Sequence, residues 1–203
     1  MNKKFKEGVL FLKKNDEVLK KIIEKMGEIE FEINPNRFES LVRIILSQQL
    51  SNKASNTILN RIESELKFFS PEQFLSKSKH EIRKCGVSES KYNSIYTISK
   101  KILLNQLNLE KIENMSTLKI KEEMIKIKGV GPWSINIFLI FGMGKLNILP
   151  LNDIGILNSV KKYYCLDSKP TNDEIIEISK KWGDYKSIAC LFLWKSYDKG
   201  ISI

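Results

Sequence analysis

The apolar and polar positions of this chain follow a helical pattern almost throughout. The stretch Ser116–Lys128, with apolar residues at Leu118, Ile120, Met124, Ile125 and Ile127, is read as one such helix. No stretch of alternating β-branched residues is bounded by the turn pairs of a β-hairpin. The pattern therefore predicts an all-α protein of about ten helices joined by short loops.

Capping residues indicate where these helices begin. Ser or Thr followed three residues later by Glu or Gln is the capping-box spacing, and a proline after the cap is suited to the first helical position. Glycines at positions 86 and 129 are placed to end two of the helices. The pattern predicts helix starts at Ser51, Ser70, Ser78, Ser88, Ser116 and Thr171.

Gly129-Val130-Gly131 separates two of the predicted helices, and Pro132 opens the second, which is expected to run through Phe141. Glycine turns a chain sharply and lets the backbone approach a phosphate, while the free N–H groups of the next helix favour an anion. Lys128 and the hydroxyl of Ser134 are placed to add phosphate contacts. An ordinary helical hairpin with a glycine C-cap explains the same residues.

Asp153 is a lone carboxylate among apolar residues, about twenty residues after the hairpin and shortly after Pro150. One interpretation is an N-cap, by Asn152 or Asp153, of a helix over Ile154–Val160. The other is an electrostatic role at an active site. Both can hold, because a cap position fixes the carboxylate.

The charge balance changes this picture only in part. The 203 residues carry 34 Lys and Arg against 24 Asp and Glu, a formal net charge of +10. Such a charge suits a polyanionic partner such as nucleic acid. Nearly all of the positive charge is lysine, as an A/T-rich genome would also produce, so the charge alone does not decide.

Composition excludes several other classes of protein. No apolar run approaches the roughly 20 residues that span a bilayer, and the apolar part of the N-terminus is too short for a signal peptide. The three cysteines and the single histidine form no cluster, which argues against a zinc or iron–sulfur site and favours reduced, structural cysteines. We expect a cytoplasmic protein without membrane contact.

Several segments together resemble one family. The stretch "RFESLVRIILSQQLSNKASNTILNRI" at 37–62 looks like its helix, Gln-Gln-Leu-Ser loop and next helix. The stretch at 85–102 ("CGVSESKYNSIYTISKKI") resembles the family's Gly-Leu-Ser…Lys segment, and the stretch at 182–194 ("WGDYKSIACLFLW") resembles its closing helix. All three stretches occur in the family's order. With Gly129-Val130-Gly131 and Asp153 between them, the chain resembles the helix-hairpin-helix (HhH-GPD) DNA glycosylase superfamily.

Within that superfamily the chain is most similar to the alkylbase, or 3-methyladenine II type, branch. The lyase-active branch has lysine two residues after the second hairpin glycine, where this chain has Trp133. The chain departs from its relatives at Ile137, where some have an aromatic residue, and at Lys186, where arginine is usual. The large N-terminal β-domain of some bacterial relatives does not fit before Arg37.

The resemblance implies one glycosylase domain made of two helical lobes. The middle lobe is expected over about 37–145, and residues 1–36 with 146–203 form the second lobe, with Asp153 in a cleft between them. It implies a monofunctional enzyme. The expected partner is double-stranded DNA that contains damaged bases, in the nucleoid if the source is bacterial or archaeal.

In that family the catalytic carboxylate, here Asp153, faces the sugar of an extruded nucleotide, and Trp133 and Trp194 line the pocket for its base. The implied activity is hydrolysis of the N-glycosidic bond of alkylated, cationic purines during base excision repair, by an enzyme that acts as a monomer. A cationic base leaves without protonation, which suits a single carboxylate without a paired acid.

The loop Gln48, Gln49, Leu50 would fill the gap that base extrusion leaves in the DNA stack. The family implies no cofactor beyond a structural monovalent cation held by main-chain carbonyls, here those of Ile125, Ile127 and Val130. Two other functions stay open: a non-catalytic helix–hairpin–helix DNA-binding module, and a glycosylase for uracil or mismatched bases.

Overall fold

The computed structural model describes residues 3–203, apart from the side chain of Glu113. It divides into two compact units. The terminal unit combines the N-terminal segment up to Glu32 with Gly144–Ile203, and the central unit is Ile33–Met143. These divisions fall close to the expected lobe limits at 37 and 145. Over residues 3–203 every regular element is helical, so the predicted all-α class is confirmed.

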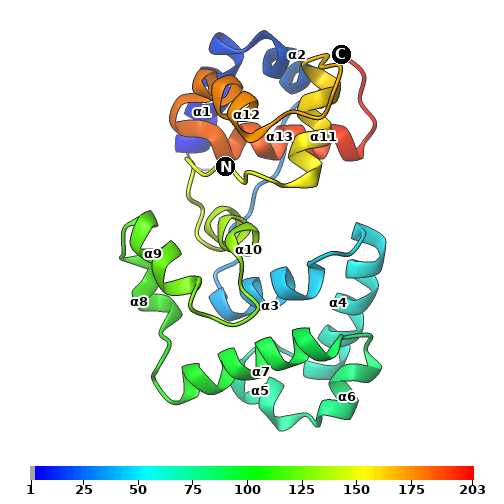
Figure 1. The fold of residues 1–203 in the computed structure, drawn as a ribbon, viewed down its shortest axis with the longest axis vertical. Coiled ribbons are helices and arrows are strands. Elements are labelled where there is room, and N and C mark those ends of the chain that lie inside the picture. Colours follow the sequence, from blue (N-terminus) through cyan, green and yellow to red (C-terminus); the bar gives the residue numbers. More distant parts are fainter. Residues whose placement is uncertain (1–2) are drawn as a thin grey trace. The chain divides into compact units, whose positions relative to one another are not determined.

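The terminal unit brings both ends of the chain into one group of helices, drawn in blue and in yellow to red in Figure 1. Its helices come from the first 32 and the last 60 residues of the chain. They are α1 (Lys3–Asn15), α2 (Glu17–Met26), α11 (Ile154–Tyr163), α12 (Asn172–Ser179), the 3₁₀ segment η2 (Lys180–Tyr185) and α13 (Lys186–Asp198).

Helix α13 is the centre of the terminal unit. Most of its residues are buried, including Ile188, Cys190, Phe192 and Leu193, because α11, α2, η2 and α1 all pack against it. A helix that is apolar on all sides must be enclosed by its neighbours. The side chains that α13 carries are therefore held in fixed positions.

A buried polar group ties α1, α2 and η2 together. Asp16 caps α2 by accepting hydrogen bonds from Val18 N and Leu19 N, and its other oxygen accepts from Tyr164 Oη at 2.6 Å and Trp182 Nε1 at 3.1 Å. Burial and the nearby carboxylate raise the pKa of Tyr164, so the phenol keeps its proton. This network satisfies a carboxylate that is only 2% exposed.

The central unit is a second helical bundle, built around α3. The buried side of α3 includes Leu41, Ile45 and Leu46, and α4, α7, α8, α10 and η1 contact it. The elements of the unit are α3 (Arg37–Ser47), α4 (Asn52–Leu66), α5 (Pro71–Ser76), α6 (Lys79–Lys84), α7 (Glu89–Leu103), α8 (Leu109–Glu113), α9 (Thr117–Met124), α10 (Pro132–Ile137) and the π-helical turn η1 (Phe138–Gly142).

The predicted helix starts are confirmed. Each predicted cap side chain accepts a hydrogen bond from the backbone N–H three residues on, and both Ser78 and Thr171 make complete capping boxes with Glu81 and Glu174. The N-caps with these bonds are Ser51, Ser70, Ser78, Ser88, Ser116 and Thr171.

Two predicted helix ends need correction. The helix expected over Ser116–Lys128 ends at Met124, because Lys126 N and Ile127 N bond to carbonyls three residues back and tighten the chain into a turn. The helix expected from Pro132 to Phe141 changes after Ile137 into the π-helical turn and ends at Gly142. Apolar spacing continues through both places and does not signal these changes.

No helix among residues 3–203 is long and apolar enough to cross a membrane.

Candidate active site

A tight turn directs Asp153 of the terminal unit. Asp153 N donates to Pro150 O at 3.2 Å, and Asn152 has a φ of 66°. Asparagine tolerates this left-handed conformation better than most residues, since its short polar side chain can bond locally. The turn ends the preceding segment and starts α11 at the next residue.

Asp153 is the N-cap of α11, as one of the two interpretations of this residue predicts. Its Oδ1 atom accepts hydrogen bonds from Ile156 N and from Trp194 Nε1, both at 2.8 Å. The residue is 8% exposed. Donors from its own helix and from α13 thus hold the carboxylate and fix its orientation.

Gly155 makes room for this arrangement. A Cβ at this position would lie 2.8 Å from Trp194 Cδ1, 3.0 Å from Trp194 Nε1 and 3.1 Å from Asp153 Oδ1. These distances are shorter than or near the limit of van der Waals contact. The indole can lie against the start of α11 because residue 155 has no side chain.

The segment that leads to Asp153 is fastened to the start of α13. Ser187 N donates to Leu146 O at 2.8 Å, and Ser187 Oγ donates to Lys145 O at 2.7 Å and accepts from Ile148 N at 3.0 Å. Lys186 Nζ donates to Asn147 Oδ1 at 2.9 Å. These bonds hold the backbone of residues 145–148, which lead to the turn, in place against α13.

The thiol of Cys190 lies on α13 one turn before Trp194 and is fully buried. Burial, together with the charge of Asp153, raises the pKa of Cys190. The group therefore stays a neutral thiol and is not suited to act as a nucleophile.

The glycine hairpin lies in the central unit, and its two glycines have different roles. Gly129 has a φ of 87°, and a Cβ there would lie 2.0 Å from Ser94 Oγ, so the fold itself requires glycine. Gly131 has an ordinary φ of −99°, and a Cβ would meet nothing within 4 Å. Gly131 is the N-cap of α10 and gives it no side-chain cap.

The loop after α3 contacts this hairpin directly. Gln48 Nε2 donates to Gly129 O at 2.9 Å and to Ser134 Oγ at 2.7 Å. Ser134 is only 2% exposed, so its hydroxyl faces Gln48 and its phosphate contact stays a prediction that this burial does not favour. Gln49 and Leu50 are exposed at the tip of the loop.

The predicted site residues therefore form two groups. Asp153 and Trp194 meet in the terminal unit, while Gln48, Gly129 and Ser134 meet in the central unit. Lys128 is exposed beside Gly129, and Trp133 is partly exposed on α10. The sequence interpretation did not identify Gly155, although an isolated glycine within a helical stretch is itself a signal for close packing.

The carbonyls of Ile125, Ile127 and Val130 follow the end of α9 and belong to the hairpin turn. Carbonyl oxygens are suitable ligands for a hard cation, but that of Ile127 already accepts a hydrogen bond from Val130 N at 3.0 Å. The cation stays a prediction. Within residues 3–203 no group of three His, Cys, Asp or Glu side chains is placed to hold a metal ion.

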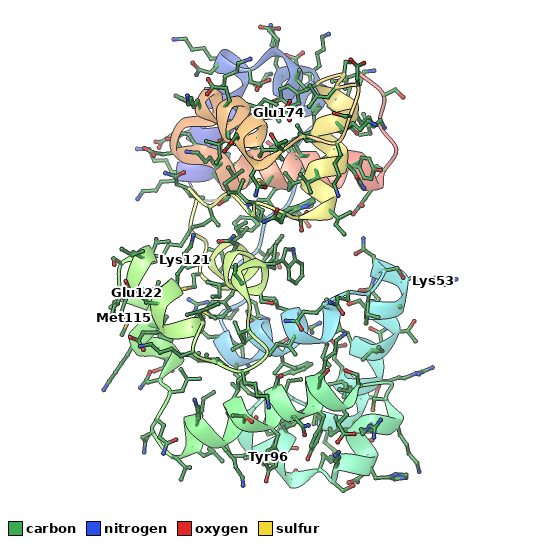
Figure 2. All side chains as sticks on the ribbon, in the orientation of Figure 1. Lys53, Tyr96, Met115, Lys121, Glu122 and Glu174 are labelled. Atoms are coloured by element: carbon green, nitrogen blue, oxygen red, sulfur yellow. The ribbon has the colours of Figure 1, made fainter. Side chains whose placement is uncertain are left out.

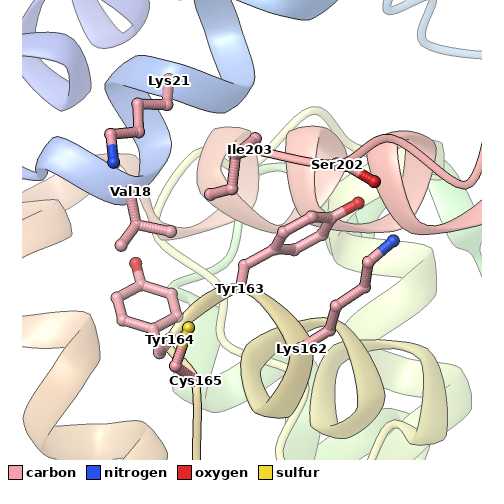
Figure 3. Close-up of a pocket in the computed structure, with 8 residues that line it drawn as sticks. All are labelled: Val18, Lys21, Lys162, Tyr163, Tyr164, Cys165, Ser202 and Ile203. Atoms are coloured by element: carbon pink, nitrogen blue, oxygen red, sulfur yellow. The ribbon is translucent and has the colours of Figure 1, made fainter.

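A pocket of about 400 Å³ in the terminal unit has a different location. Its lining, drawn in Figure 3, includes Lys162 and Tyr163 of α11, Tyr164 after the end of that helix, and Lys21 of α2. Neither Asp153 nor Trp194 lines it. The pocket is therefore separate from the candidate catalytic group.

Comparisons with known proteins identify the family of this chain. The family described as "HhH-GPD superfamily base excision DNA repair protein" matches residues 42–184, which include the loop, the hairpin and Asp153. The protein named "Alkylbase DNA glycosidase-like protein mag2" from Schizosaccharomyces pombe is 30% identical over 198 residues, which cover 94% of this chain and 93% of that protein.

Two solved structures have the same fold. The 3-methyladenine DNA glycosylase Mag1 of S. pombe, solved in complex with abasic DNA, superposes with a TM-score of 0.85 at 27% identity and covers 95% of this chain and 97% of its own. A DNA-3-methyladenine glycosidase from Bacillus halodurans has a TM-score of 0.77 at 31% identity and covers 93% and 88%. With its glycine hairpin and its capped aspartate in the matched region, this chain belongs to the HhH-GPD superfamily of base excision DNA repair proteins.

Proposed function

We propose that this protein is a monofunctional DNA glycosylase that extrudes alkylated, cationic purines from duplex DNA and hydrolyses their N-glycosidic bonds. The observation that carries the proposal is the fixed carboxylate of Asp153, which Ile156 N and Trp194 Nε1 hold through Oδ1. The names of the relatives, which include alkylbase and 3-methyladenine glycosylases, support the same activity.

Asp153 supplies the chemistry. Cleavage of the N-glycosidic bond gives the sugar oxocarbenium character, so positive charge develops next to the base that leaves. A preoriented carboxylate stabilises that charge without reorganisation during the reaction. It also orients the attacking water or accepts its proton.

The substrate class follows from the leaving group. A purine alkylated at N3 or N7 carries a positive charge and departs as a neutral base, so no general acid is needed. A cationic base is also attracted to aromatic faces. Trp133 and Trp194 are the indoles assigned to the base pocket. Ile137, in place of an aromatic residue, would make that pocket less enclosing and its discrimination among lesions modest.

The hairpin supplies DNA binding. Gly131 leaves the start of α10 without a side-chain cap and without a Cβ in front of it, an arrangement that admits a phosphate close to the backbone N–H groups. Lys128 is exposed next to this turn. Lys53 projects away from the start of α4 in Figure 2, close in sequence to the Gln48–Leu50 loop.

The reaction ends with base release and an intact strand. A lyase forms a Schiff base between a lysine and the sugar, and Trp133 occupies the position where the lyase-active branch has that lysine. The product DNA should therefore break only after hot alkali. Strand cleavage during the reaction, with borohydride trapping a covalent complex, would contradict the monofunctional assignment.

The test is incubation with a panel of duplexes that each contain one lesion: 3-methyladenine, 7-methylguanine, hypoxanthine, uracil or a mismatch. Abasic sites should form fastest with the two methylated purines. Faster release of uracil would favour the uracil or mismatch alternative. Binding to every duplex without any base release would identify a non-catalytic DNA-binding module.

A further inference from the structure

One lysine of α7 holds the loop that follows α3. Lys91 Nζ donates to Leu46 O and to Gln48 O, each at 2.8 Å. Leu46 is in the last turn of α3 and Gln48 is its C-cap, so these carbonyls belong to a helix end that lacks partners of its own. A cationic donor is a favourable partner at such an end.

The ammonium group of Lys91 is bound to these two carbonyls. It is partly buried, and burial lowers its pKa by disfavouring the charged form. Over residues 3–203 no carboxylate lies within ion-pair distance of its ammonium group. Partial burial of a lysine ammonium costs free energy unless hydrogen bonds compensate for the lost water. The two loop carbonyls are the contacts that provide this compensation.

The same turn of α7 also contacts the hairpin. Ser94 lies three residues after Lys91, and its Oγ occupies the space that a side chain at Gly129 would need. Gln48 links the loop to the hairpin directly, because its Nε2 donates to Gly129 O and Ser134 Oγ. Loop and hairpin are thus fastened to one helix and to each other.

The tip of the loop is in a conformation that needs this support. Gln49 has a φ of 56°, in the left-handed region that side chains other than glycine rarely adopt. Leu50, the next residue, is 38% exposed although it is apolar. The loop therefore presents Gln49 and Leu50 outward from a backbone that Lys91 and Gln48 hold.

We propose that Lys91 is a positioning residue for base extrusion: it locks the Gln48–Leu50 loop in the conformation that enters the DNA stack, so that loop and hairpin meet DNA as one preformed surface. The inference rests on the proposed function. A loop that is already ordered loses less conformational freedom on binding, so more of the contact energy remains to offset the unstacking of the base.

The first experiment needs no catalysis. The DNA is a duplex with a tetrahydrofuran abasic analogue and the fluorescent base 2-aminopurine opposite it. Entry of the loop unstacks the 2-aminopurine and raises its fluorescence. Lys91→Met should bind this DNA within about threefold of wild type, since one charge is lost, but should lose most of the fluorescence rise.

Lys100→Met is the matched control, because Lys100 lies on the same helix, is exposed and contacts the ring of Tyr96 at 4.8 Å. It removes the same charge and should keep the fluorescence rise. Lys91→Arg keeps donors and charge and should recover most of it. Should Lys91→Met melt at a much lower temperature than wild type, Lys91→Gln replaces it as the neutral variant.

The second experiment measures single-turnover release of a methylated purine from a duplex and from the same single strand. Lys91→Met should be roughly tenfold slower on the duplex, because a loosened loop enters the stack less readily, and near normal on the single strand, where no base has to be unpaired. Equal losses on both substrates would make Lys91 a purely structural residue.

The two experiments separate the inference from the proposed function. If wild type releases no base, the proposed function fails, and the fluorescence experiment still tests the loop. If wild type binds the abasic duplex without a fluorescence change, or if Lys91→Met keeps the full change, the positioning role of Lys91 is wrong.

Discussion

The hairpin of the central unit and the Asp153 turn of the terminal unit are built alike, but the helix starts that follow them differ in electrostatic character. In each, a residue with positive φ, Gly129 at 87° or Asn152 at 66°, precedes the start of a helix. At the hairpin the N-cap is Gly131, and α10 has no side-chain cap. At the other turn the N-cap is Asp153, whose carboxylate bonds to Ile156 N.

This difference is the reason why we propose DNA binding for the hairpin and chemistry for Asp153. An uncapped helix start offers N–H groups and the positive end of the helix dipole to an anion. A start capped by aspartate satisfies those groups internally and instead presents a fixed negative charge, which stabilises a cation. The first suits a phosphate and the second an oxocarbenium-like sugar. Changes at each turn should therefore have different kinetic consequences.

The largest expected effect is that of Asp153→Asn on base release. Asparagine can still cap α11, so the fold should remain, but the negative charge that we propose for stabilising the sugar is lost. Single-turnover release should fall by about a hundredfold to a thousandfold or more, with affinity for abasic DNA nearly unchanged. A folded variant with near-normal turnover would leave Asp153 as a cap alone.

Gly155→Ala should slow the same step by roughly tenfold to a hundredfold, because misplacing a catalytic group by about 1 Å costs that much. The added Cβ would lie 2.8 Å from Trp194 Cδ1 and must move the indole that bonds to Asp153. Asn158→Ala on the same helix is the control. Trp194→Phe removes the Nε1 donor and part of the ring, and it should slow base release to a similar extent. Normal rates in both variants would show that Trp194 does not position the carboxylate of Asp153.

Gly131→Val should weaken DNA binding about tenfold, the worth of one charge-assisted hydrogen bond, without lowering the melting temperature, because a Cβ there meets nothing within 4 Å. The affinity loss should be similar for all sequences and the salt dependence of binding shallower. Gly129→Ala should do the reverse and destabilise the fold. Unchanged affinity in a folded Gly131→Val protein would remove the hairpin from the DNA interface.

The smallest expected effect is selective. Trp133→Leu should reduce release of 7-methylguanine about twofold to fivefold more than release of neutral hypoxanthine, since a cation–π contact at a partly exposed site is worth about 0.5–1 kcal/mol. Parallel single-turnover rates on matched duplexes measure this ratio. An equal loss for both bases would make Trp133 a packing residue of α10.

The sequence by itself determined the local events of this fold. Ser78 with Glu81 and Thr171 with Glu174 mark helix starts because the groups that bond are three residues apart in the chain. The glycine hairpin and the aspartate after Pro150 were likewise visible as local patterns, and several ordered motifs pointed to the family. Such features depend on neighbours in sequence, so a pattern can contain them.

Only the tertiary structure decided which distant groups meet. Trp194 reaches Asp153 across 41 residues, and Lys91 reaches Leu46 across 45. The sequence predicts a phosphate contact for Ser134, yet its hydroxyl is buried and bonded to Gln48. The reason is physical: caps and turns are satisfied within one helical turn, whereas a hydrogen bond between helices requires both helices to be packed first.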